Sequence, residues 1–496
     1  MSDVIRIHPE NGKIFEYQGK PLVLLCATEH YGAVMNRPFR FERYLEDARE
    51  KGQTLTRLFT LFRELQTPIN PYSTCKPESP DYISPFRRTG PGRALDGQPK
   101  FDLKQWNPEF FDRLHRFLSL AEEYGIVVEV VLFSNTYNDA IWTLNPLNPA
   151  NNLDLDSDSP VPWQHYLTLR SRELLGWQQA HARKLVEETN RYGNVIYEIC
   201  NEPSHFPAAD TELPQADEVN AWQSHFIGLI REVEQDLPRQ HLIAGQEAMT
   251  TRPFHQPCDG SMDEMDFDVV NIHPLPNTIC QGRSYDMGDF MSKQLKLRAV
   301  REFALATYDR AKPLNYDEDN VATQYKEVEG WTVHRKRAWT TLFSGAHYDM
   351  IDFSIVPFLE SGTPESQRGI RQWMGHLSGF IHSVDLVRAR PLTGWLQDQP
   401  EHTIESVLAA AGKDYCIYLA DEREVDETGC GESIEGRLSF ELPPGAYNVS
   451  SFSPVDGVYS PAIRLDGGEK RSLAVPAFAH DIVVRVRRTV TAERQD

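Results

Sequence analysis

The sequence predicts an α/β protein in which a (β/α)8 TIM barrel is followed by a small antiparallel β-sandwich. Between residues 21 and 356, short apolar runs alternate eight times with longer amphipathic stretches. After residue 385 this alternation stops, and short β-rich runs are separated by turns that contain glycine and proline. Eight strands alternating with helices indicate a parallel sheet covered on both faces, and eight is the strand number at which such a sheet closes into a barrel.

Each expected barrel strand is a short apolar run bounded by polar residues or glycine. The eight runs cover residues 21–27, 54–62, 126–134, 194–200, 241–245, 267–273, 312–317 and 348–356. Helices are expected at residues 41–51, 108–124, 166–192, 215–237, 287–310 and 331–344, with one more ending near residue 382. Two insertions, residues 66–100 and 135–163, are rich in turn residues and are expected to be loops. A doubly wound open sheet is the alternative, weakened because no GxGxxG follows the first strand.

The C-terminal part reads as a separate domain. Strands are expected at residues 403–409, 415–419, 437–442, 447–453 and 482–487, with turn signals such as Pro443-Pro444-Gly445 between them. Short strands at regular spacing are typical of an antiparallel sandwich. We therefore expect a catalytic barrel over residues 1–384 and an accessory β-sandwich over residues 385–496.

Composition and charge narrow the class of partner. The chain is 40% hydrophobic and carries a formal net charge of −21. This charge disfavours nucleic acid, an anionic membrane surface and a polyanionic substrate, all of which attract clustered Lys and Arg. No apolar run reaches the length of a membrane span. A neutral small molecule or neutral polysaccharide is the simplest partner, and the oligomeric state is left open, a homo-oligomer included.

The N-terminus and the cysteines favour a cytoplasmic protein. The first residues lack the basic start and the apolar stretch of a secretory signal. The 7 cysteines are scattered, and none forms a CxxC pair. We therefore expect neither a disulfide framework nor a structural zinc site, and no metal or other cofactor.

Polar residues gather where the expected strands end. In a barrel of this kind, function lies at the carboxyl ends of the strands. In strand order, the polar residues at or near those ends are Glu29 and His30, Arg57, Asn135, Asn201 and Glu202, Glu247, His273 and Glu318. A barrel with a purely structural role would not need so many charged groups at one end.

Two of these residues have the pairing that retaining glycoside hydrolysis requires. The reaction uses two carboxyl groups about 5 Å apart, one protonated and one ionised. Glu202 and Glu318 end the fourth and seventh strands, which face each other across the barrel mouth. Glu202 would act as general acid/base and Glu318 as nucleophile, with Arg57 holding its charge. Asn201 is placed to bind a sugar hydroxyl beside the reacting carbon.

The same residues carry a family resemblance. Asn201-Glu202-Pro203 after an apolar strand, with Arg57 on strand two and Glu318 ending strand seven, resembles clan A of the glycoside hydrolases. The resemblance covers most of residues 1–385 and implies an acid/base after strand four and a nucleophile after strand seven. It also implies that His273 contacts substrate, and the C-terminal segment resembles the β-sandwich appended to several glycosidases of this clan.

One departure from the clan concerns the aromatic platform for the sugar. Many members place a tryptophan at the end of strand eight, where this chain has Asp352-Phe353-Ser354. Trp142, Trp163 and Trp331 are the expected replacements.

Less specific interpretations stand beside these. Asn-Glu-Pro alone more often marks an entry turn into a helix, and Glu318, Asp317 and Asp319 could each be a solvated loop charge. Arg57 could form a structural ion pair with Glu198, and His273 could be a core histidine.

Two other functional classes compete with a glycosidase. A metal-dependent barrel hydrolase or isomerase would generally want an HxH pair on strand one, where Glu29 and His30 instead alternate to opposite sides. A non-catalytic carbohydrate-binding protein is the second rival. A chain without activity would have no reason to keep Asn201, Glu202 and Glu318 together.

Overall fold

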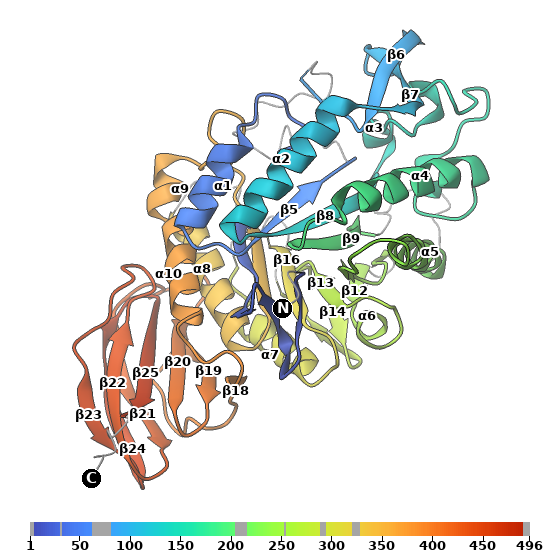
Figure 1. The fold of residues 1–496 in the computed structure, drawn as a ribbon. Coiled ribbons are helices and arrows are strands. Elements are labelled where there is room, and N and C mark those ends of the chain that lie inside the picture. Colours follow the sequence, from blue (N-terminus) through green and yellow to red (C-terminus); the bar gives the residue numbers. More distant parts are fainter. Residues whose placement is uncertain are drawn as a thin grey trace.

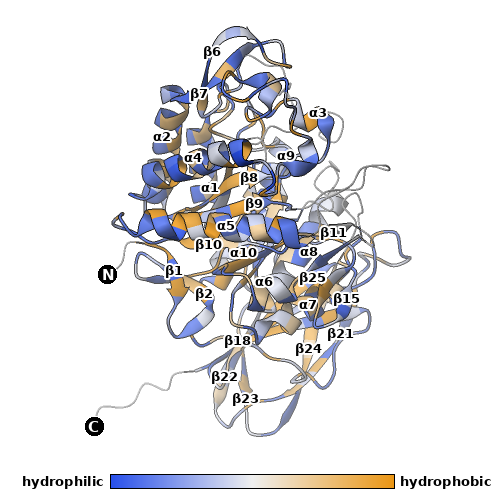
Figure 2. Cartoon of the chain, turned by 90° about the vertical axis from the view of Figure 1, so that its right-hand side faces the viewer, coloured by the Kyte–Doolittle hydropathy of each residue, from blue (hydrophilic) through white to orange (hydrophobic). Residues whose placement is uncertain are grey.

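A computed structural model describes residues 4–29, 32–61, 81–203, 216–251, 254–287, 294–319 and 328–489. A central sheet is surrounded by helices, and an all-β unit is attached at one side (Figure 1). Hydrophobic residues gather on the central strands, whereas the surrounding helices carry hydrophilic residues outward (Figure 2).

The central sheet has the eight parallel strands that the sequence predicts. In chain order they are β4 Leu25–Thr28, β5 Leu55–Phe59, β8 Val127–Ser134, β9 Val195–Asn201, β10 Leu242–Gly245, β13 Val269–Ile272, β16 Leu314–Asp319 and β17 His347–Ile351. Their order in the sheet is β4-β17-β16-β13-β10-β9-β8-β5. The two outer strands are joined through Thr54, whose N–H donates to the Leu25 carbonyl (3.0 Å) and whose hydroxyl accepts from the Leu25 N–H (2.9 Å). The barrel prediction is confirmed.

The helices follow the predicted order with some corrected bounds. They are α1 Phe41–Glu50, α2 Pro108–Tyr124, α4 Arg172–Thr189, α5 Ala216–Glu234, α7 Leu297–Tyr308, α8 Val328–Phe343, α9 Pro364–Arg368 and α10 Ile370–Ile381. The predicted start of α4 at residue 166 is wrong because Ser171 caps the helix by accepting from the Leu174 N–H. The predicted start of α7 at residue 287 is also wrong, since Lys296 has a left-handed backbone (φ 46°) that cannot continue a helix.

An N-terminal sheet that the sequence analysis did not predict closes the bottom of the barrel. Its strands are β1 Arg6–His8, β2 Asn11–Tyr17 and β3 Lys20–Leu22. The predicted strand over residues 21–27 is therefore divided between β3 and β4. Phe15 and Tyr17 of β2 pack against inward-facing residues at the amino ends of the strands, among them Leu55 and Val127. A ligand can therefore contact side chains at the other end of the barrel, where the strands have their carboxyl ends.

The insertions at the carboxyl end contain more regular structure than expected. The predicted loop over residues 66–100 includes a hairpin made by β6 Phe86–Arg93 and β7 Pro99–Trp106, while residues 66–80 lie outside the described part. The insertion after β8 holds α3 Asp139–Trp142, η1 Pro149–Asn151 and η2 Trp163–His165. Further short elements follow β10 and β13: β11 Thr250–Thr251, β12 Phe254–Pro257, α6 Asp259–Asp263, β14 Thr278–Cys280 and β15 Arg283–Tyr285. Alternation was too short in these segments to predict strands.

The C-terminal unit is the predicted antiparallel sandwich. One sheet has the order β18-β19-β20-β25-β22-β23, and β21 and β24 form the second. The bounds are β18 Arg390–Pro391, β19 Thr403–Ala410, β20 Asp414–Asp421, β21 Ile434–Glu441, β22 Ala446–Phe452, β23 Ile463–Asp466, β24 Lys470–Phe478 and β25 Asp481–Arg488. Ile417, Leu438 and Val484 share the core between the sheets. The predicted domain boundary near residue 385 falls between α10 and β18, and it stays a prediction.

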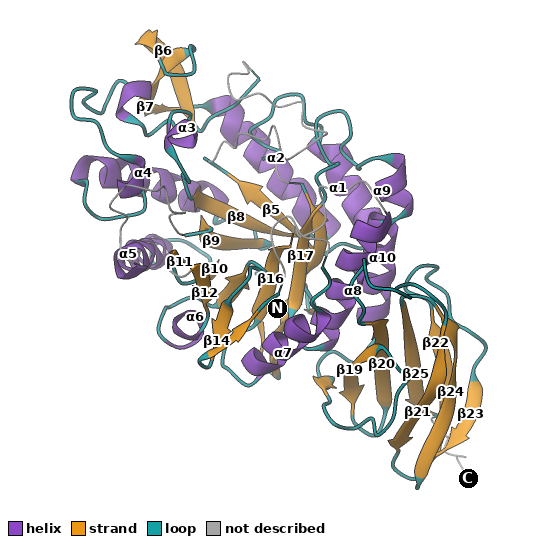
Figure 3. Ribbon diagram, turned by 180° about the vertical axis from the view of Figure 1, so that it is seen from behind, coloured by secondary structure: helices purple, strands orange, loops and turns teal. Residues whose placement is uncertain are grey.

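The outer face of the six-stranded sheet packs against α8 and α10 (Figure 3). Tyr418 of β20 stacks on Trp339 of α8, with ring centroids 5.5 Å apart and planes 17° apart. Arg335 of α8 donates from Nε (2.9 Å) and Nη2 (2.8 Å) to the buried carboxylate of Asp481. The sandwich is thus joined to the barrel by a continuous core and a buried ion pair.

Within the described residues, no helix is both long and apolar enough to cross a membrane. The six described cysteines are free thiols.

Candidate active site

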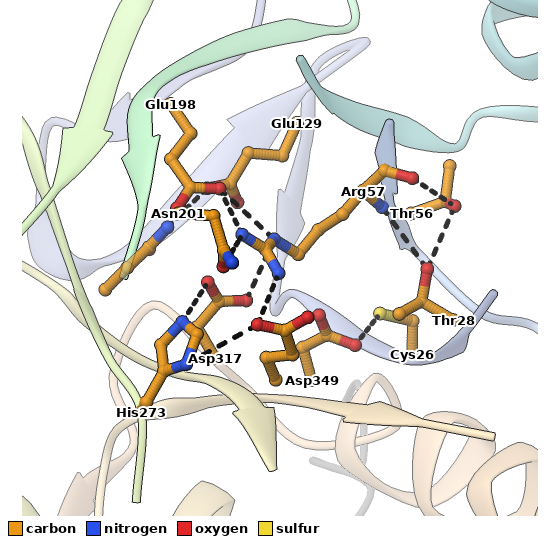
Figure 4. Close-up of polar contacts among 12 residues, drawn as sticks. Cys26, Thr28, Thr56, Arg57, Glu129, Glu198, Asn201, His273, Asp317 and Asp349 are labelled. Carbon is orange, nitrogen blue, oxygen red and sulfur yellow. Dashed lines mark hydrogen bonds and ion pairs between the residues drawn. The ribbon is translucent and has the colours of Figure 1, made fainter. Parts of the chain in front are cut away.

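Five of the predicted site residues meet at the carboxyl end of the barrel. Arg57 comes from β5, Asn201 ends β9 and Glu202 follows it, His273 follows β13, and Glu318 lies near the end of β16. All five residues are at least nine-tenths buried. Figure 4 shows Arg57 at the centre of this group, with Asn201, His273 and carboxylates around its guanidinium.

An irregularity in β16 directs two consecutive carboxylates into the barrel. Neighbouring residues of a regular strand point to opposite faces. Here the register with β17 shifts between Tyr316 and Asp319, and Glu318 has a left-handed backbone (φ 53°). As a result both Asp317 and Glu318 reach Arg57, at 3.3 Å from its Nε and 3.4 Å from its Nη1. Such bulges often redirect a side chain next to an active site.

The third acidic residue of this strand points the other way. Asp319 accepts from Arg337 Nε of α8 (2.6 Å) and from the Tyr348 hydroxyl (2.9 Å). It therefore serves the packing of α8 on the sheet, and it is separated from the group at the barrel mouth.

Glu202 also has a left-handed backbone, with φ 48°. Its Oε2 accepts a short hydrogen bond from the Tyr137 hydroxyl, and its Oε1 lies 3.1 Å from His273 Nδ1. Asn201 Nδ2 donates to the same hydroxyl (3.2 Å) and its Oδ1 accepts from Arg57 Nη2 (3.1 Å). A strained backbone at both Glu202 and Glu318 is the kind of local cost that clusters at functional sites.

His273 connects the two glutamates. Its Nδ1 lies 3.1 Å from Glu202 Oε1 and 3.4 Å from Glu318 Oε2, and its Nε2 lies 3.5 Å from Asp317 Oδ2. Burial alone would lower the pKa of this imidazole, but Asp317, Glu202 and Glu318 raise it well above its usual value. His273 is therefore a second cation beside Arg57 at neutral pH.

Arg57 has both of the roles considered from the sequence. It forms a buried ion pair with Glu198 (Nη2 to Oε2, 2.5 Å), and it also contacts Glu318. Although burial opposes its charge, Asp317, Glu198 and Glu318 hold its pKa well above the usual value. A buried, permanently charged guanidinium with several donors can hold these carboxylates in fixed positions.

Further carboxyl groups lie in the barrel just below the site (Figure 4). Burial raises the pKa of Glu198 to about 7, even beside Arg57. Burial and the neighbouring Glu198 and Asp317 raise the pKa of Glu129 well above its usual value, and Asn271 Nδ2 donates to its carboxyl group. Burial and Asp317 do the same to the pKa of Asp349, which accepts from the Cys26 thiol (2.9 Å). In this layer, burial thus disfavours the charged forms of Glu129 and Asp349.

The spacing of the two glutamates defines what the site can do. Single ligand atoms of Glu202, His273 and Glu318 all lie within 4.8 Å of one another. One carboxyl oxygen of Glu202 and one of Glu318 are thus close enough to contact the same small group of a ligand.

The same atoms have the types and spacing of a metal site, as do those of Glu129, Glu198 and Asp317. A ligating histidine must be neutral, whereas the carboxylates around His273 favour its protonated form. In the second group, Glu198 and Asp317 are already paired with Arg57. Electrostatics therefore favour a network of charged hydrogen bonds at both places over a bound cation.

The remaining predicted residues have other surroundings. Glu29 is buried and accepts from the Ala33 N–H (2.8 Å), so it shapes the loop after β4. Asn135 is fully buried, and its Oδ1 accepts from the Tyr137 N–H (3.1 Å). The structure places both in supporting positions, and His30 lies outside the described residues.

The prediction that Trp142 supplies a sugar platform is wrong. Its side chain packs in the barrel core, 4% exposed, and its indole N–H donates to the Val161 carbonyl (2.8 Å). Trp163 and Trp331 are buried as well. These residues lie in α3, η2 and α8, and their rings are packed inward, where a large aromatic surface is most stabilising.

Tyr137 was missed by the sequence analysis. It follows the carboxyl end of β8 by three residues and has a left-handed backbone (φ 53°). Its position in a polar segment just after a barrel strand was the available signal. A lone tyrosine there has no motif to distinguish it from other loop aromatics.

Comparisons with known proteins bear on the fold. A family described as "Domain of unknown function (DUF6298)" matches residues 75–165. No curated protein matches by sequence. Among solved structures, a glycoside hydrolase family 5 protein from Bacteroides vulgatus superposes with a TM-score of 0.62 and 12% identity, covering 99% of this chain and 95% of that one. Another, titled "Glycoside hydrolase", gives 0.59 and 12%, over 98% and 97%.

These superpositions extend over both units of the chain. The barrel with its appended sandwich is therefore a fold shared with glycoside hydrolase structures, as the resemblance to clan A implied.

Proposed function

We propose that the chain is a retaining glycoside hydrolase that acts on a neutral glycoside, oligosaccharide or polysaccharide. The observation that carries the proposal is the pair Glu202 and Glu318, which come from strands across the barrel and have carboxyl oxygens within 4.8 Å of each other. Retaining enzymes have carboxyl groups about 5–5.5 Å apart and inverting enzymes about 6.5–9.5 Å. The shared fold with glycoside hydrolase structures agrees with this reaction.

Glu318 is suited to be the nucleophile because two cations face it. Arg57 Nη1 and His273 Nδ1 each lie 3.4 Å from its Oε2. Both favour the ionised carboxylate. The anion attacks the anomeric carbon, the bond to the leaving oxygen breaks, and a covalent glycosyl ester forms on Glu318.

Glu202 is suited to be the acid/base because its partner can serve either protonation state. The Tyr137 hydroxyl can donate to a carboxylate or accept from a protonated carboxyl group. Glu202 gives its proton to the leaving oxygen in the first step. In the second step it takes a proton from the water that hydrolyses the ester, which returns both glutamates to their starting states.

Chemical rescue tests these roles separately. Glu318→Ala should abolish hydrolysis of activated aryl glycosides, and azide should restore some turnover and give a glycosyl azide of inverted configuration. Glu202→Ala should slow substrates with poor leaving groups far more than activated ones. Glu247→Gln is the matched control, since Glu247 follows β10 but packs beneath Gly260, apart from this group. Rescue at Asp317→Ala instead, or equal losses on both substrate types for Glu202→Ala, would overturn the assignment.

A metal-dependent hydrolase remains the second candidate because Glu202, His273 and Glu318 have the spacing of a ligand set. Elemental analysis of the purified protein separates the two. A stoichiometric divalent ion whose removal abolishes turnover would favour the metal enzyme.

A further inference from the structure

A second cleft lies far from the glutamates, between α10 and the six-stranded sheet of the sandwich. Its volume is about 910 Å³, within the range of ligand-binding pockets of about 300–1,000 Å³. One wall is the last half of α10, with His376, Gly379 and Phe380, and the other is formed by strands β22 and β25 and the loop after β22. We call it the interdomain cleft.

The interdomain cleft is at the opposite end of the barrel from the candidate active site. The N–H of Val23, two residues before β4 begins, donates to Nε2 of His382 directly after α10 (3.3 Å). The end of α10 that lines the cleft therefore lies beside the amino ends of the strands. Glu202 and Glu318 lie at the carboxyl ends, so the cleft is separate from the proposed catalytic centre.

The sheet face that lines the cleft changes character along its length. Next to the barrel, Phe452 pairs across the strands with Val483, and both pack into the core. Because side chains alternate, the next pairs on this same face are Ser450 with Arg485 and Asn448 with Arg487. The apolar contact surface thus continues as a strip of hydroxyl, amide and guanidinium groups.

The cations of this strip exceed the anions that face them. Arg485 is buried and makes two hydrogen bonds to Asp414 (3.0 and 2.6 Å), which neutralises it. The Arg487 side chain is 54% exposed and reaches that same carboxylate at 3.4 Å. Arg488 also lines the cleft and donates to the Pro444 carbonyl (2.9 Å). In a chain with a net charge of −21, this is a local excess of positive charge.

An exposed aromatic ring completes the wall. Tyr459 is 46% exposed, although its ring packs almost parallel to Phe380 with centroids 6.1 Å apart. Arg485 Nη1 donates to its hydroxyl (3.0 Å), which fixes the ring in place. A partly exposed aromatic ring that is held in place beside hydroxyl and amide groups is suited to pack against a sugar ring.

On the side of the cleft formed by α10, Gly379 has no side chain that would project into the cleft. Glycine in a helix interior costs about 1 kcal/mol relative to alanine. A Cβ at Gly379 would meet nothing within 4 Å, so packing does not require a glycine at this position. Its effect is to leave room in the cleft.

From these observations we propose that the interdomain cleft is an accessory binding site for a saccharide that carries one carboxylate, such as a hexuronate unit within a short oligosaccharide. Arg487 would bind the carboxylate, Tyr459 would pack against a sugar ring, and Ser450 and Asn448 would bind hydroxyl groups. One acidic unit matches the small excess of positive charge, whereas a long polyanion would be repelled by the rest of the chain.

Calorimetric titration of the full chain with Glu318→Gln tests the proposal without turnover. The probes are xylotriose that carries a single glucuronate, xylotriose itself, and inorganic phosphate. We expect the acidic oligosaccharide to bind at least tenfold more tightly than either of the others. Arg487→Ala and Tyr459→Ala should each weaken this binding by roughly tenfold or more, and Gly379→Leu should block it by filling the cleft while keeping every arginine.

Arg437→Ala is the matched control because Arg437 is an exposed arginine on β21 of the other sheet. Equal binding of xylotriose and its acidic derivative would overturn the carboxylate requirement. Phosphate binding as tight as that of the acidic oligosaccharide would overturn the proposal that the ligand is a saccharide. Acidic-oligosaccharide binding that survives both Arg487→Ala and Gly379→Leu would place the site elsewhere. None of these outcomes depends on catalysis, so a failure here is distinguishable from a failure of the glycosidase proposal.

Discussion

The Tyr137 hydroxyl donates to Oε2 of Glu202 from a residue whose own backbone is left-handed, with φ 53°. Asn201 Nδ2 donates to the same hydroxyl at 3.2 Å. The Asn201 amide thus orients the phenol, and the phenol orients the glutamate. Tyr137 belongs to the insertion after β8, so this loop contributes directly to the proposed acid/base.

Tyr137→Phe should impair acid/base catalysis while leaving the fold intact. Without the hydroxyl, Glu202 loses the partner that can both donate and accept, and we expect kcat/KM for poor leaving groups to fall roughly 10- to 100-fold. Activated aryl glycosides should lose much less. The check is a leaving-group series measured on both enzymes. Tyr192→Phe is the control, because its hydroxyl contacts His115 between α2 and α4; equal losses in the two variants would contradict a specific role.

Arg57→Lys should lower the activity strongly, although the substitution keeps the positive charge. The guanidinium reaches Glu198, Asp317 and Glu318 at once, and an ammonium group is a point charge that cannot keep all three contacts. We expect kcat to fall roughly 100- to 1,000-fold, the range seen when a preorganised charge partner is removed, with a smaller change in KM.

Steady-state kinetics of this variant should be compared with those of Arg37→Lys. Arg37 pairs with Glu109 at the surface, where both side chains are 45% exposed. Since exposed pairs contribute little, Arg37→Lys should behave as the unmodified chain. A fully active Arg57→Lys enzyme would show that Glu318 does not need the several donors of a guanidinium group.

The barrel could be predicted because its strands are buried on both faces. Runs such as residues 126–134 and 194–200 are mostly apolar. This pattern can be recognised without knowing which strands pair with each other. Several of the strands that were missed are exposed: β23 has no buried residue, and β6 has a single one. Their side chains do not alternate strongly, since they form on surfaces that the rest of the fold provides.

The site could be predicted in part for a similar reason. Strand ends fix which polar residues share the barrel mouth, so Arg57, Glu202 and Glu318 could be placed together by counting strands. The bulge that turns Glu318 inward depends on a backbone conformation that no residue pattern marks. The failure at Trp142 has the opposite cause, because an aromatic residue in a loop can serve a ligand or the core, and only packing decides between them.

Glu129→Gln should make the chain less sensitive to alkaline pH. Burial, with Glu198 and Asp317, raises the pKa of Glu129 in the folded state, so its contribution to stability is full below the unfolded pKa of about 4.3. That contribution is lost as the pH rises toward the folded pKa, at up to about 1.4 kcal/mol per pH unit. Glutamine stays neutral and can keep the bond from Asn271.

Calorimetric Tm values between pH 5 and 8 measure this difference. The Tm of Glu129→Gln relative to the unmodified chain should rise by roughly 1–2 °C per pH unit. Glu435→Gln, at an exposed position of β21, should leave the difference flat. A Tm difference for Glu129→Gln that does not change with pH would mean that Glu129 is ionised in the folded chain.

Asp481→Ala should destabilise the barrel and the sandwich together. Asp481 accepts two hydrogen bonds from Arg335 of α8 and one from the Tyr418 hydroxyl (3.1 Å), and both members of the ion pair are buried. Removing the carboxylate leaves the guanidinium buried without its partner, which costs about 3–5 kcal/mol. We expect a single calorimetric transition that moves to lower temperature by several degrees, because Trp339 and Tyr418 keep the two units in one core.

Glu422→Ala is the matched control for this interface. Glu422 pairs with Arg298 across the same two units, but the side chains are 33% and 64% exposed. An exposed pair of this kind contributes less than about 1 kcal/mol, so the transition should hardly move. If Asp481→Ala instead splits off a separate early transition while the main one stays in place, the sandwich unfolds independently, and the buried ion pair stabilises the contact between the units without coupling their folding.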